Sequence, residues 1–331
     1  MTAGSMMRDA AASTGPTMTF DASKLHVFTA RSNPLGWVAP HRNWQRFAKH
    51  MIDSGVVLTV VECAYGKEPF ACEMDGVRHI GVRAKTRGWN KENLLNIGVH
   101  RTPEAEYIAW IDADVIFRRP DWASATVSAL QHYDVVQPWS DAYDLGPNGE
   151  HMAHHRSFCR QFFHREPMVA THAKFWQGDG GPYVYPHSGY AWAMTRQAFD
   201  WVGGLFELGG MGSGDHHMAL GLIGQAESSM PGGTSQAYRA EVMRWQDRAE
   251  RHINRNIGYV PGTLEHLFHG RKYDRGYLSR WDMFVKHAFD PHADLKRNSF
   301  GVLEFATNKP ELRHDFDLYL QSRNEDVNVA W

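Results

Sequence analysis

The sequence has no long apolar run, few cysteines and little net charge, and each absence narrows the class of protein. No eighteen consecutive apolar residues occur in the 331 residues, so we expect no membrane-spanning helix. Three cysteines, Cys63, Cys72 and Cys159, are too few and too scattered for a disulfide framework or a zinc site, which favours a reducing, cytoplasmic setting. A formal net charge of −2 indicates no polyanionic partner for the molecule as a whole.

Lysine is also scarce, with 10 lysines against 25 arginines. The planar arginine guanidinium suits phosphates and carboxylates, although a GC-rich genome would produce the same excess. Residues 1–23 are small, polar and aperiodic and lack the apolar stretch of a secretory signal. We predict a disordered leader there.

Strand and helix patterns alternate through the next ninety residues. Runs of β-branched and apolar residues favour strands, and apolar residues at three- and four-residue spacing favour helices. This order predicts an α/β fold, a Rossmann-type three-layer α/β/α sandwich around a mostly parallel mixed sheet. The expected strands cover 24–30, 56–64, 76–82 and 107–117, and the expected helices cover 41–55 and 91–102.

The second half of the chain is less regular. Helices are expected over 120–133, 214–224 and 241–253, a strand over 135–139, and a strand running into a helix over 188–204. Residues 140–188 show little periodicity. We predict one domain over 24–290, with halves 24–118 and 119–290, and a looser C-terminal extension over 291–331.

Two aspartates, Asp112 and Asp114, close the apolar run YIAWIDADVIF at 107–117. Ligands of open parallel sheets bind beyond the carboxyl ends of the strands, and side chains two apart share a face. Two carboxylates there suit a hard divalent cation such as Mg²⁺ or Mn²⁺, although an exposed acidic turn would look the same.

The order of motifs over about 24–280 resembles the GT-A fold glycosyltransferases, phage-type members included, with an Asp-x-Asp motif at a strand end. FTARSN at 28–33 lies where that family contacts the nucleotide, which implies roles for Ala30, Arg31 and Asn33. The resemblance also implies nucleotide contacts in three further segments, through Glu62 in VVECAYG, Arg83 and Lys91 in RAKTRGWNKENLLNIGV, and Asp112 and Ala113 in IDADVIF.

Further along, GSGDHHMAL at 212–220 lies where the family carries an acid at the start of a helix. The resemblance implies that Asp215 is the general base for the acceptor hydroxyl. Asp after Ser-Gly is equally a good helix N-cap.

LEHLFHGRKYDRGYLSR at 264–280 resembles the late histidine of the family, followed by basic residues near the diphosphate. We favour His269 over His266 as a metal ligand, because Gly270 after it allows close backbone approach. The implied metal shell is Asp112, Asp114 and His269, and Arg271 and Lys272 would bind the diphosphate.

The resemblance implies an enzyme that uses Mn²⁺ or Mg²⁺ to transfer a hexosyl group from a nucleoside diphosphate sugar, a UDP-sugar first, to a hydroxyl acceptor. Inversion is expected and retention stays open. The candidate acceptors are DNA carrying 5-hydroxymethylcytosine, for which arginines of the 241–255 segment would bind phosphates, and a glycan, protein or lipid. A nucleotidyltransferase and a non-catalytic nucleotide-sugar binding protein are the alternatives.

Overall fold

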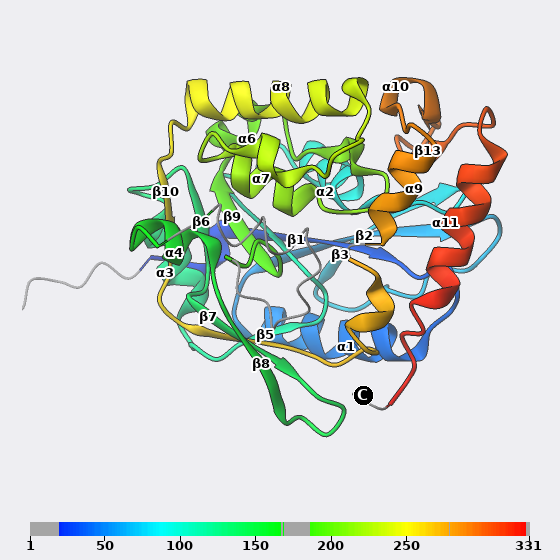
Figure 1. The fold of residues 1–331 in the computed structure, drawn as a ribbon. Coiled ribbons are helices and arrows are strands. Elements are labelled where there is room, and N and C mark those ends of the chain that lie inside the picture. Colours follow the sequence, from blue (N-terminus) through cyan, green and yellow to red (C-terminus); the bar gives the residue numbers. More distant parts are fainter. Residues whose placement is uncertain (1–19, 167, 169–185, 278, 329–331) are drawn as a thin grey trace, which may run out of the picture.

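The computed structural model describes residues 20–166, 168, 186–277 and 279–328, and its central feature is a seven-stranded sheet (Figure 1). The strand order is β10-β6-β9-β4-β1-β2-β3, and within this sheet only β9 runs antiparallel to its neighbours. The predicted α/β sandwich with a mostly parallel mixed sheet is therefore confirmed. The strands are β1 (Leu25–Ser32), β2 (Val57–Tyr65), β3 (Val77–Ala84), β4 (Tyr107–Ile111), β6 (Val135–Gln137), β9 (Ala191–Thr195) and β10 (Ile257–Tyr259).

Helices cover both faces of this sheet because successive residues of its strands point to opposite sides. In β1, Val27 packs into the core beneath the sheet and Phe28 into the core above it. Figure 1 shows α1 below the sheet and α2, α6, α7 and α8 above it. These helices and α3 beside the sheet are α1 (Val38–Asp53), α2 (Lys91–His100), α3 (Trp122–Ala129), α6 (Arg196–Val202), α7 (Gly214–Gly221) and α8 (Gln236–His252).

A second, smaller sheet corrects the expectation of one strand over 107–117. The chain leaves the central sheet after Ile111 and enters the second sheet at Val115. The break falls at the two aspartates, because residues 113–114 form a turn between the two strands. The order is β5 (Val115–Phe117), β11 (Thr263–His266), β7 (Asp141–Leu145) and β8 (His151–Arg156).

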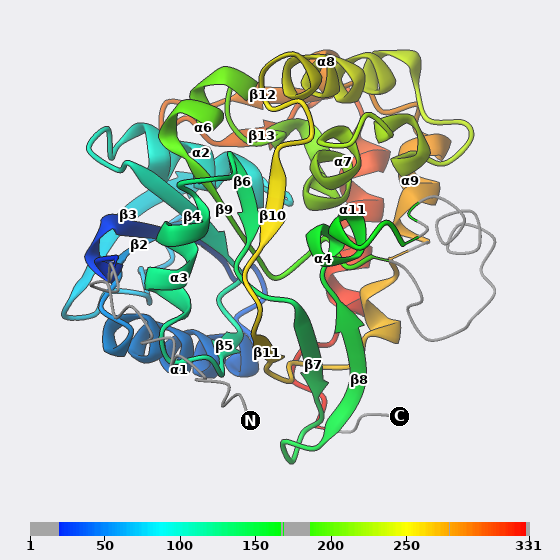
Figure 2. The ribbon, with the colours of Figure 1, turned by 90° about the vertical axis from the view of Figure 1, so that its left-hand side faces the viewer.

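The β7–β8 hairpin projects from the molecule (Figure 2) and lies in the region 140–188, for which no strand was expected. Most side chains of β8 are exposed or half-buried, so the strand lacks the alternating apolar pattern that identifies strands in a sequence. It is followed by α4 (Phe158–Phe163).

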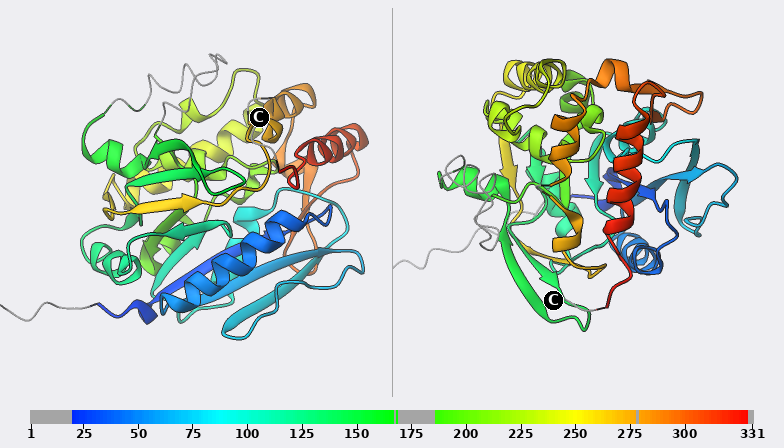
Figure 3. Two further views of the ribbon diagram at one scale, coloured as in Figure 1. Left: turned by 90° about the horizontal axis from the view of Figure 1, so that it is seen from below. Right: turned by 45° about the vertical axis from the view of Figure 1, so that its right-hand side comes forward.

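The C-terminal segment is not the looser extension expected from the sequence, since α11 packs Leu312, Phe316 and Leu320 into the main core. Figure 3 shows α11 alongside α9. The elements from residue 280 onward are α9 (Arg280–Lys286), α10 (Pro291–Asp294), β12 (Leu295–Arg297), β13 (Leu303–Phe305) and α11 (Pro310–Ser322). The 3₁₀ turns are η1 (Ala22–Lys24), η2 (Glu207–Gly209), η3 (Ala226–Ser229) and η4 (Tyr273–Arg275).

The remaining expectations concern the leader, the cysteines and the membrane. The predicted leader lies outside the described residues except for 20–23, and this last part is not disordered, since Asp21 is the N-cap residue of η1 and Ala22 and Ser23 belong to it. All three cysteines are buried free thiols. Within the described ranges, no helix combines the length and the apolar character needed to cross a bilayer.

Candidate metal centre and active site

The acidic pair lies where the chain passes from the central sheet to the second sheet. The amide of Asp112 donates to the carbonyl of Tyr190 at 2.8 Å, and the carbonyl of Asp114 accepts from the amide of Leu267 at 2.7 Å. These bonds hold the turn at the carboxyl end of β4, the edge at which open α/β sheets bind ligands.

Three potential metal ligands meet at this edge. Oδ2 of Asp114 lies 2.8 Å from Nε2 of His269 and 3.6 Å from Nε2 of His266. The ligand atoms all lie within 4.8 Å of one another. The other oxygen of Asp114, Oδ1, is buried and has no hydrogen-bond partner in the described part of the chain. Two imidazoles and a carboxylate with a spare oxygen fit a divalent cation.

Sheet register explains how His266 reaches a site more than 150 residues earlier in the chain. β11 pairs antiparallel with β5, and His266 stands opposite Val115, the residue after Asp114. His269 follows three residues later, and Gly270 beside it has a φ of +84°. A Cβ on Gly270 would lie 2.9 Å from the carbonyl oxygen of Asn324. Gly270 therefore lets the C-terminal segment pass directly against the metal centre.

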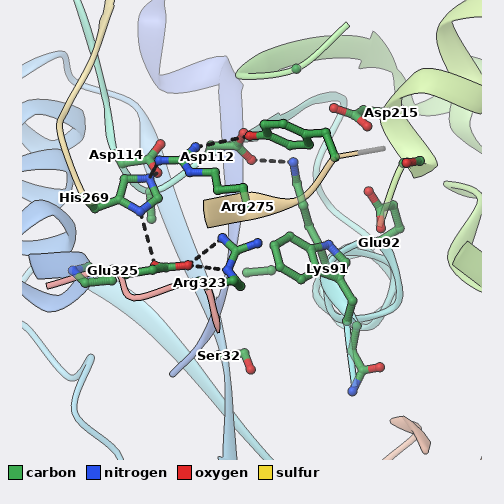
Figure 4. Close-up of a pocket in the computed structure, with 18 of the residues that line it drawn as sticks. Ser32, Lys91, Glu92, Asp112, Asp114, Asp215, His269, Arg275, Arg323 and Glu325 are labelled. Atoms are coloured by element: carbon green, nitrogen blue, oxygen red, sulfur yellow. Dashed lines mark hydrogen bonds and ion pairs between the residues drawn. The ribbon is translucent and has the colours of Figure 1, made fainter. Parts of the chain in front are cut away.

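Each histidine is oriented by a second carboxylate. Nδ1 of His266 lies 2.9 Å from Oδ1 of Asp144. Nδ1 of His269 lies 3.2 Å from Oε2 of Glu325, as Figure 4 shows. A carboxylate at Nδ1 holds the proton on that nitrogen, so that Nε2 turns its lone pair toward Asp114 once the ring is deprotonated. This arrangement is typical of histidines that bind metal ions.

A second cation stands at the same histidine. Nη2 of Arg275 lies 2.9 Å from Nε2 of His269, the nitrogen that also faces Asp114. With the Nε2 lone pair and a carboxylate oxygen 2.8 Å apart, positive charge must lie between or beside them. In this structure the guanidinium of Arg275 supplies it.

The pKa values of these groups reflect the same charges. Burial opposes the ionised carboxylate of Asp114, but His266 and His269 outweigh it and hold the pKa well below its usual range. Burial likewise opposes the charged form of His266, yet Asp114 and Asp144 raise its pKa to about 9. Glu325 is buried too, and Arg323 and His269 lower its pKa to about 2. The acids are thus ionised and poised for cations.

A second charged cluster lies across the cavity at the start of α2 and α7. Lys91 forms an ion pair with Asp112. Burial opposes the charge on Lys91, but Asp112, Asp215 and Glu92 raise its pKa overall. Burial raises the pKa of Asp215, and it raises that of Glu92 to about 7. Carboxyl groups of raised pKa in a cleft are candidates for proton transfer near neutrality.

Both clusters line one cavity of about 290 Å³. Figure 4 shows Asp215, Glu92 and Lys91 on one side and His269, Arg275 and the C-terminal residues on the other. The residues expected from the sequence that line it are Ala30, Arg31, Asn33, Lys91, Asp112, Ala113, Asp114, Asp215, His269 and Lys272.

Three expected site residues do not line the cavity. Glu62 accepts hydrogen bonds from the amides of Ala71 and Cys72 and from His79, so its carboxylate fixes the loop between β2 and β3. Arg83 and Arg271 have partners elsewhere. Arg83 donates to two carbonyls of that loop, and Arg271 pairs with Asp274. Asp112, expected as a metal ligand, is instead paired with Lys91 and stands outside the ligand cluster.

The structure adds residues that the sequence analysis did not assign to the site. His266 lies in the ligand cluster, and its three-residue spacing from His269 was the available signal. Lys272, which was expected at the site, pairs with one of the added residues, Asp144. Three others lie within quoted segments but were not singled out: Glu92, Arg275 and Arg280. Asp144, Arg323 and Glu325 come from distant segments and carry no local signal.

Fold and site together define an α/β protein with a candidate metal centre and an acidic cluster facing each other across one cavity. No family model matches the sequence, and no curated protein matches it. Several solved structures resemble this one in their backbone arrangement. One is a Drosophila β1,4-galactosyltransferase 7 mutant in complex with manganese, UDP-Gal and xylobiose, at 10% identity and a TM-score of 0.40, covering 87% of this chain and 96% of that one.

Another is the glucosyl-3-phosphoglycerate synthase of Mycobacterium tuberculosis in complex with Mn²⁺, UDP and phosphoglyceric acid. It is 14% identical with a TM-score of 0.39, over 86% of this chain and 89% of that one.

Proposed function

We propose that this protein is a metal-dependent glycosyltransferase that moves a sugar from a nucleoside diphosphate sugar to a hydroxyl group of an acceptor. The observation that carries the proposal is one cavity with two opposed functional groups. Asp114, His266 and His269 form a cation site on one side, and Asp215, a carboxyl group of raised pKa, faces it. The first group suits a diphosphate leaving group and the second suits an acceptor hydroxyl.

The ligand set favours Mn²⁺ over Mg²⁺. Mg²⁺ prefers oxygen ligands and gives up its water reluctantly, whereas the cluster offers two imidazole nitrogens and the carboxylate of Asp114. A divalent cation here would supply Lewis-acid charge to the departing diphosphate.

The donor is best accommodated with its diphosphate at the cation site and its nucleoside toward the end of β1. Ala30, Arg31, Asn33 and Ala113 line that part of the cavity, and a uridine diphosphate sugar is the first donor to test. Lys272 and Arg275 line the cavity beside the metal centre. Cationic donors near developing phosphate charge typically contribute about 3–4 kcal/mol each to transition-state stabilisation.

Transfer then needs one base. The carboxylate of Asp215 takes the proton of the acceptor hydroxyl while that oxygen forms a bond to the anomeric carbon of the donor. The bond from the anomeric carbon to the phosphate oxygen breaks, and the nucleoside diphosphate leaves with the electron pair. Lys91, held by Asp112, positions charge beside Asp215. Direct attack of this kind inverts the anomeric configuration, and NMR of the product distinguishes inversion from retention.

The test is a donor screen that measures released nucleoside diphosphate. UDP-glucose, UDP-galactose and UDP-N-acetylglucosamine are incubated with the full chain and Mn²⁺, with and without excess EDTA. We expect release that EDTA abolishes and Mn²⁺ restores. Release of pyrophosphate from a nucleoside triphosphate would favour the nucleotidyltransferase, and donor binding without any release would favour a binding protein.

A DNA acceptor stays a prediction that no contact among the described residues favours. Three of the four arginines of α8 face partners of their own: Arg239 pairs with Glu227, Arg244 pairs with Glu241, and Arg248 donates to the carbonyl of Val202. No residue of α8 lines the cavity. Duplex DNA carrying 5-hydroxymethylcytosine therefore enters the screen as one acceptor, beside glycans.

A further inference from the structure

Two buried arginines line the cavity without a carboxylate partner in the described part of the chain. Arg275 and Arg280 are 7% and 8% exposed, and no carboxylate oxygen of a described residue lies within 4.0 Å of either guanidinium. Arg323, the third buried arginine of the cavity, pairs with Glu325. Because a buried charge is costly unless it is paired, an unpaired guanidinium in a cavity indicates an anion that binds there.

The two arginines serve different parts of the cavity. Arg275 contacts His269 of the candidate metal centre, where the donor diphosphate is expected. Arg280, the first residue of α9, instead donates from Nη2 to the hydroxyl of Ser213 at 2.6 Å. Ser213 is the N-cap residue of α7 and precedes Asp215 by two positions. Arg280 therefore lies on the side of the proposed base.

Its neighbours hold the Arg280 side chain in this place. The guanidinium carbon lies 5.2 Å from the centre of the Tyr277 ring. Gly212 has a φ of +97°, and a Cβ there would lie 3.0 Å from Nη1 of Arg280. The guanidinium thus fills the space that a side chain at residue 212 would need, and it is kept at the cavity wall.

We propose that Arg280 binds an anionic group of the acceptor, so that the acceptor is a small hydroxyl compound carrying a phosphate or a carboxylate. The proposal rests on the glycosyl transfer proposed above. The hydroxyl that loses its proton to Asp215 must lie beside that carboxylate, and the acceptor's neighbouring group then meets Arg280. The donor's own phosphates are engaged at the opposite side, by the cation site, Lys272 and Arg275.

The test compares matched acceptors of different charge. Glycerol, glycerol 3-phosphate and glycerate are supplied with the donor that shows metal-dependent release, and the product and the nucleoside diphosphate are both measured. We expect kcat/KM to be about 100-fold higher for at least one of the charged acceptors than for glycerol. A site built to hydrogen-bond a substrate group strongly disfavours a substrate that lacks this group. The phosphate and carboxylate arms identify which anion is taken.

Arg280→Gln should reduce that preference to near unity by raising KM for the charged acceptor. Arg280→Lys keeps a charge without the bidentate fork and should retain an intermediate preference. Arg251→Gln, at an exposed position of α8, is the control and should keep the full preference. Thermal melting curves verify that each variant is folded, and if Arg280→Gln fails to fold, Arg280→Lys carries the test.

Three outcomes overturn the inference while the proposed function stands. One is metal-dependent donor hydrolysis with no preference for charged acceptors. Another is an equal fall of kcat for neutral and charged acceptors in Arg280→Gln, which would mean that Arg280 acts on Asp215. The third is a charge preference that follows the donor sugar, with UDP-glucuronate favoured over UDP-glucose. Absence of any metal-dependent release, in contrast, removes the proposed function itself.

Discussion

Nδ1 of His269 lies 3.2 Å from the carboxylate of Glu325, a residue 56 positions further along the chain. The contact exists because Gly270 allows the backbone at 324–325 to pass against it. The C-terminal segment is thereby part of the candidate metal centre, and through Arg323 and Glu325 it also forms part of the cavity wall.

The first prediction separates the two aspartates of the acidic pair. Asp114→Asn should weaken Mn²⁺ binding at least 100-fold and abolish transfer, because Asp114 is the carboxylate of the ligand cluster. Asp112→Asn should weaken Mn²⁺ binding far less, since Asp112 is paired with Lys91. Titration of free Mn²⁺ by electron paramagnetic resonance measures both affinities. Equal losses in the two variants would contradict the cluster and restore the pair as joint ligands.

The second prediction concerns the carboxylates behind the histidines. Glu325→Gln and Asp144→Asn should each lower Mn²⁺ affinity by about 10–100-fold. Each substitution removes the carboxylate that fixes the Nδ1 proton and the ring orientation of one histidine ligand. Glu311→Gln, at an exposed position of α11, is the matched control for Glu325. Unchanged affinity in both variants would show that neither carboxylate orients a ligand.

The third prediction is a pH dependence of stability from Glu92. Burial raises its pKa from 4.5 to about 7, so the folded state holds this proton more tightly than the unfolded state. The contribution of protonated Glu92 to the free energy of unfolding is fully present below about pH 4.5. It is lost as the pH rises through 7, which lowers the free energy of unfolding by about 3 kcal/mol. Glu92→Gln should remove that loss.

Urea unfolding of wild type and Glu92→Gln in EDTA, at pH 5 and pH 8, measures the difference. Between pH 5 and pH 8, the free energy of unfolding of the wild type should fall by about 3 kcal/mol more than that of the variant. A wild-type protein that loses no more stability than the variant over this range would refute the assignment.

How much of this was predictable depends on how local each signal is. The strands and helices over 24–100 follow from periodicity, and the Asp112–Asp114 motif marks the right strand end because an apolar run stops there. Asp144 reaches His266 only through the parallel pairing of β7 with β11, across 122 residues. Glu325 reaches His269 only through the packing of α11. No local sequence pattern predicts strand register or packing. Glu62 is the opposite case: its local position at a strand end predicted a site residue, but its carboxylate accepts hydrogen bonds from a neighbouring loop.

The fourth prediction tests Asp215 as the base against Asp215 as an acid that only stabilises the start of α7, since Ser213 and not Asp215 is the N-cap residue. Asp215 is the second residue of α7, after the N-cap Ser213, and its Oδ1 accepts from the adjacent amide of His216 at 2.9 Å. If it acts as the base, Asp215→Asn should lower kcat by about 10²–10⁴-fold and change the donor's dissociation constant much less. If it only stabilises the first turn of α7, the variant should lose about 1 kcal/mol of stability or less and keep most of its turnover.

Steady-state kinetics, calorimetric donor binding and urea unfolding on one preparation separate these cases. A collapse of donor affinity in Asp215→Asn would place this carboxylate on the donor side of the cavity. Ser213→Ala provides a comparison within the same turn, because it removes the hydroxyl that accepts from Arg280 while leaving Asp215 in place. Its effect should fall on KM for the acceptor rather than on kcat, since Ser213 positions Arg280 and takes no proton.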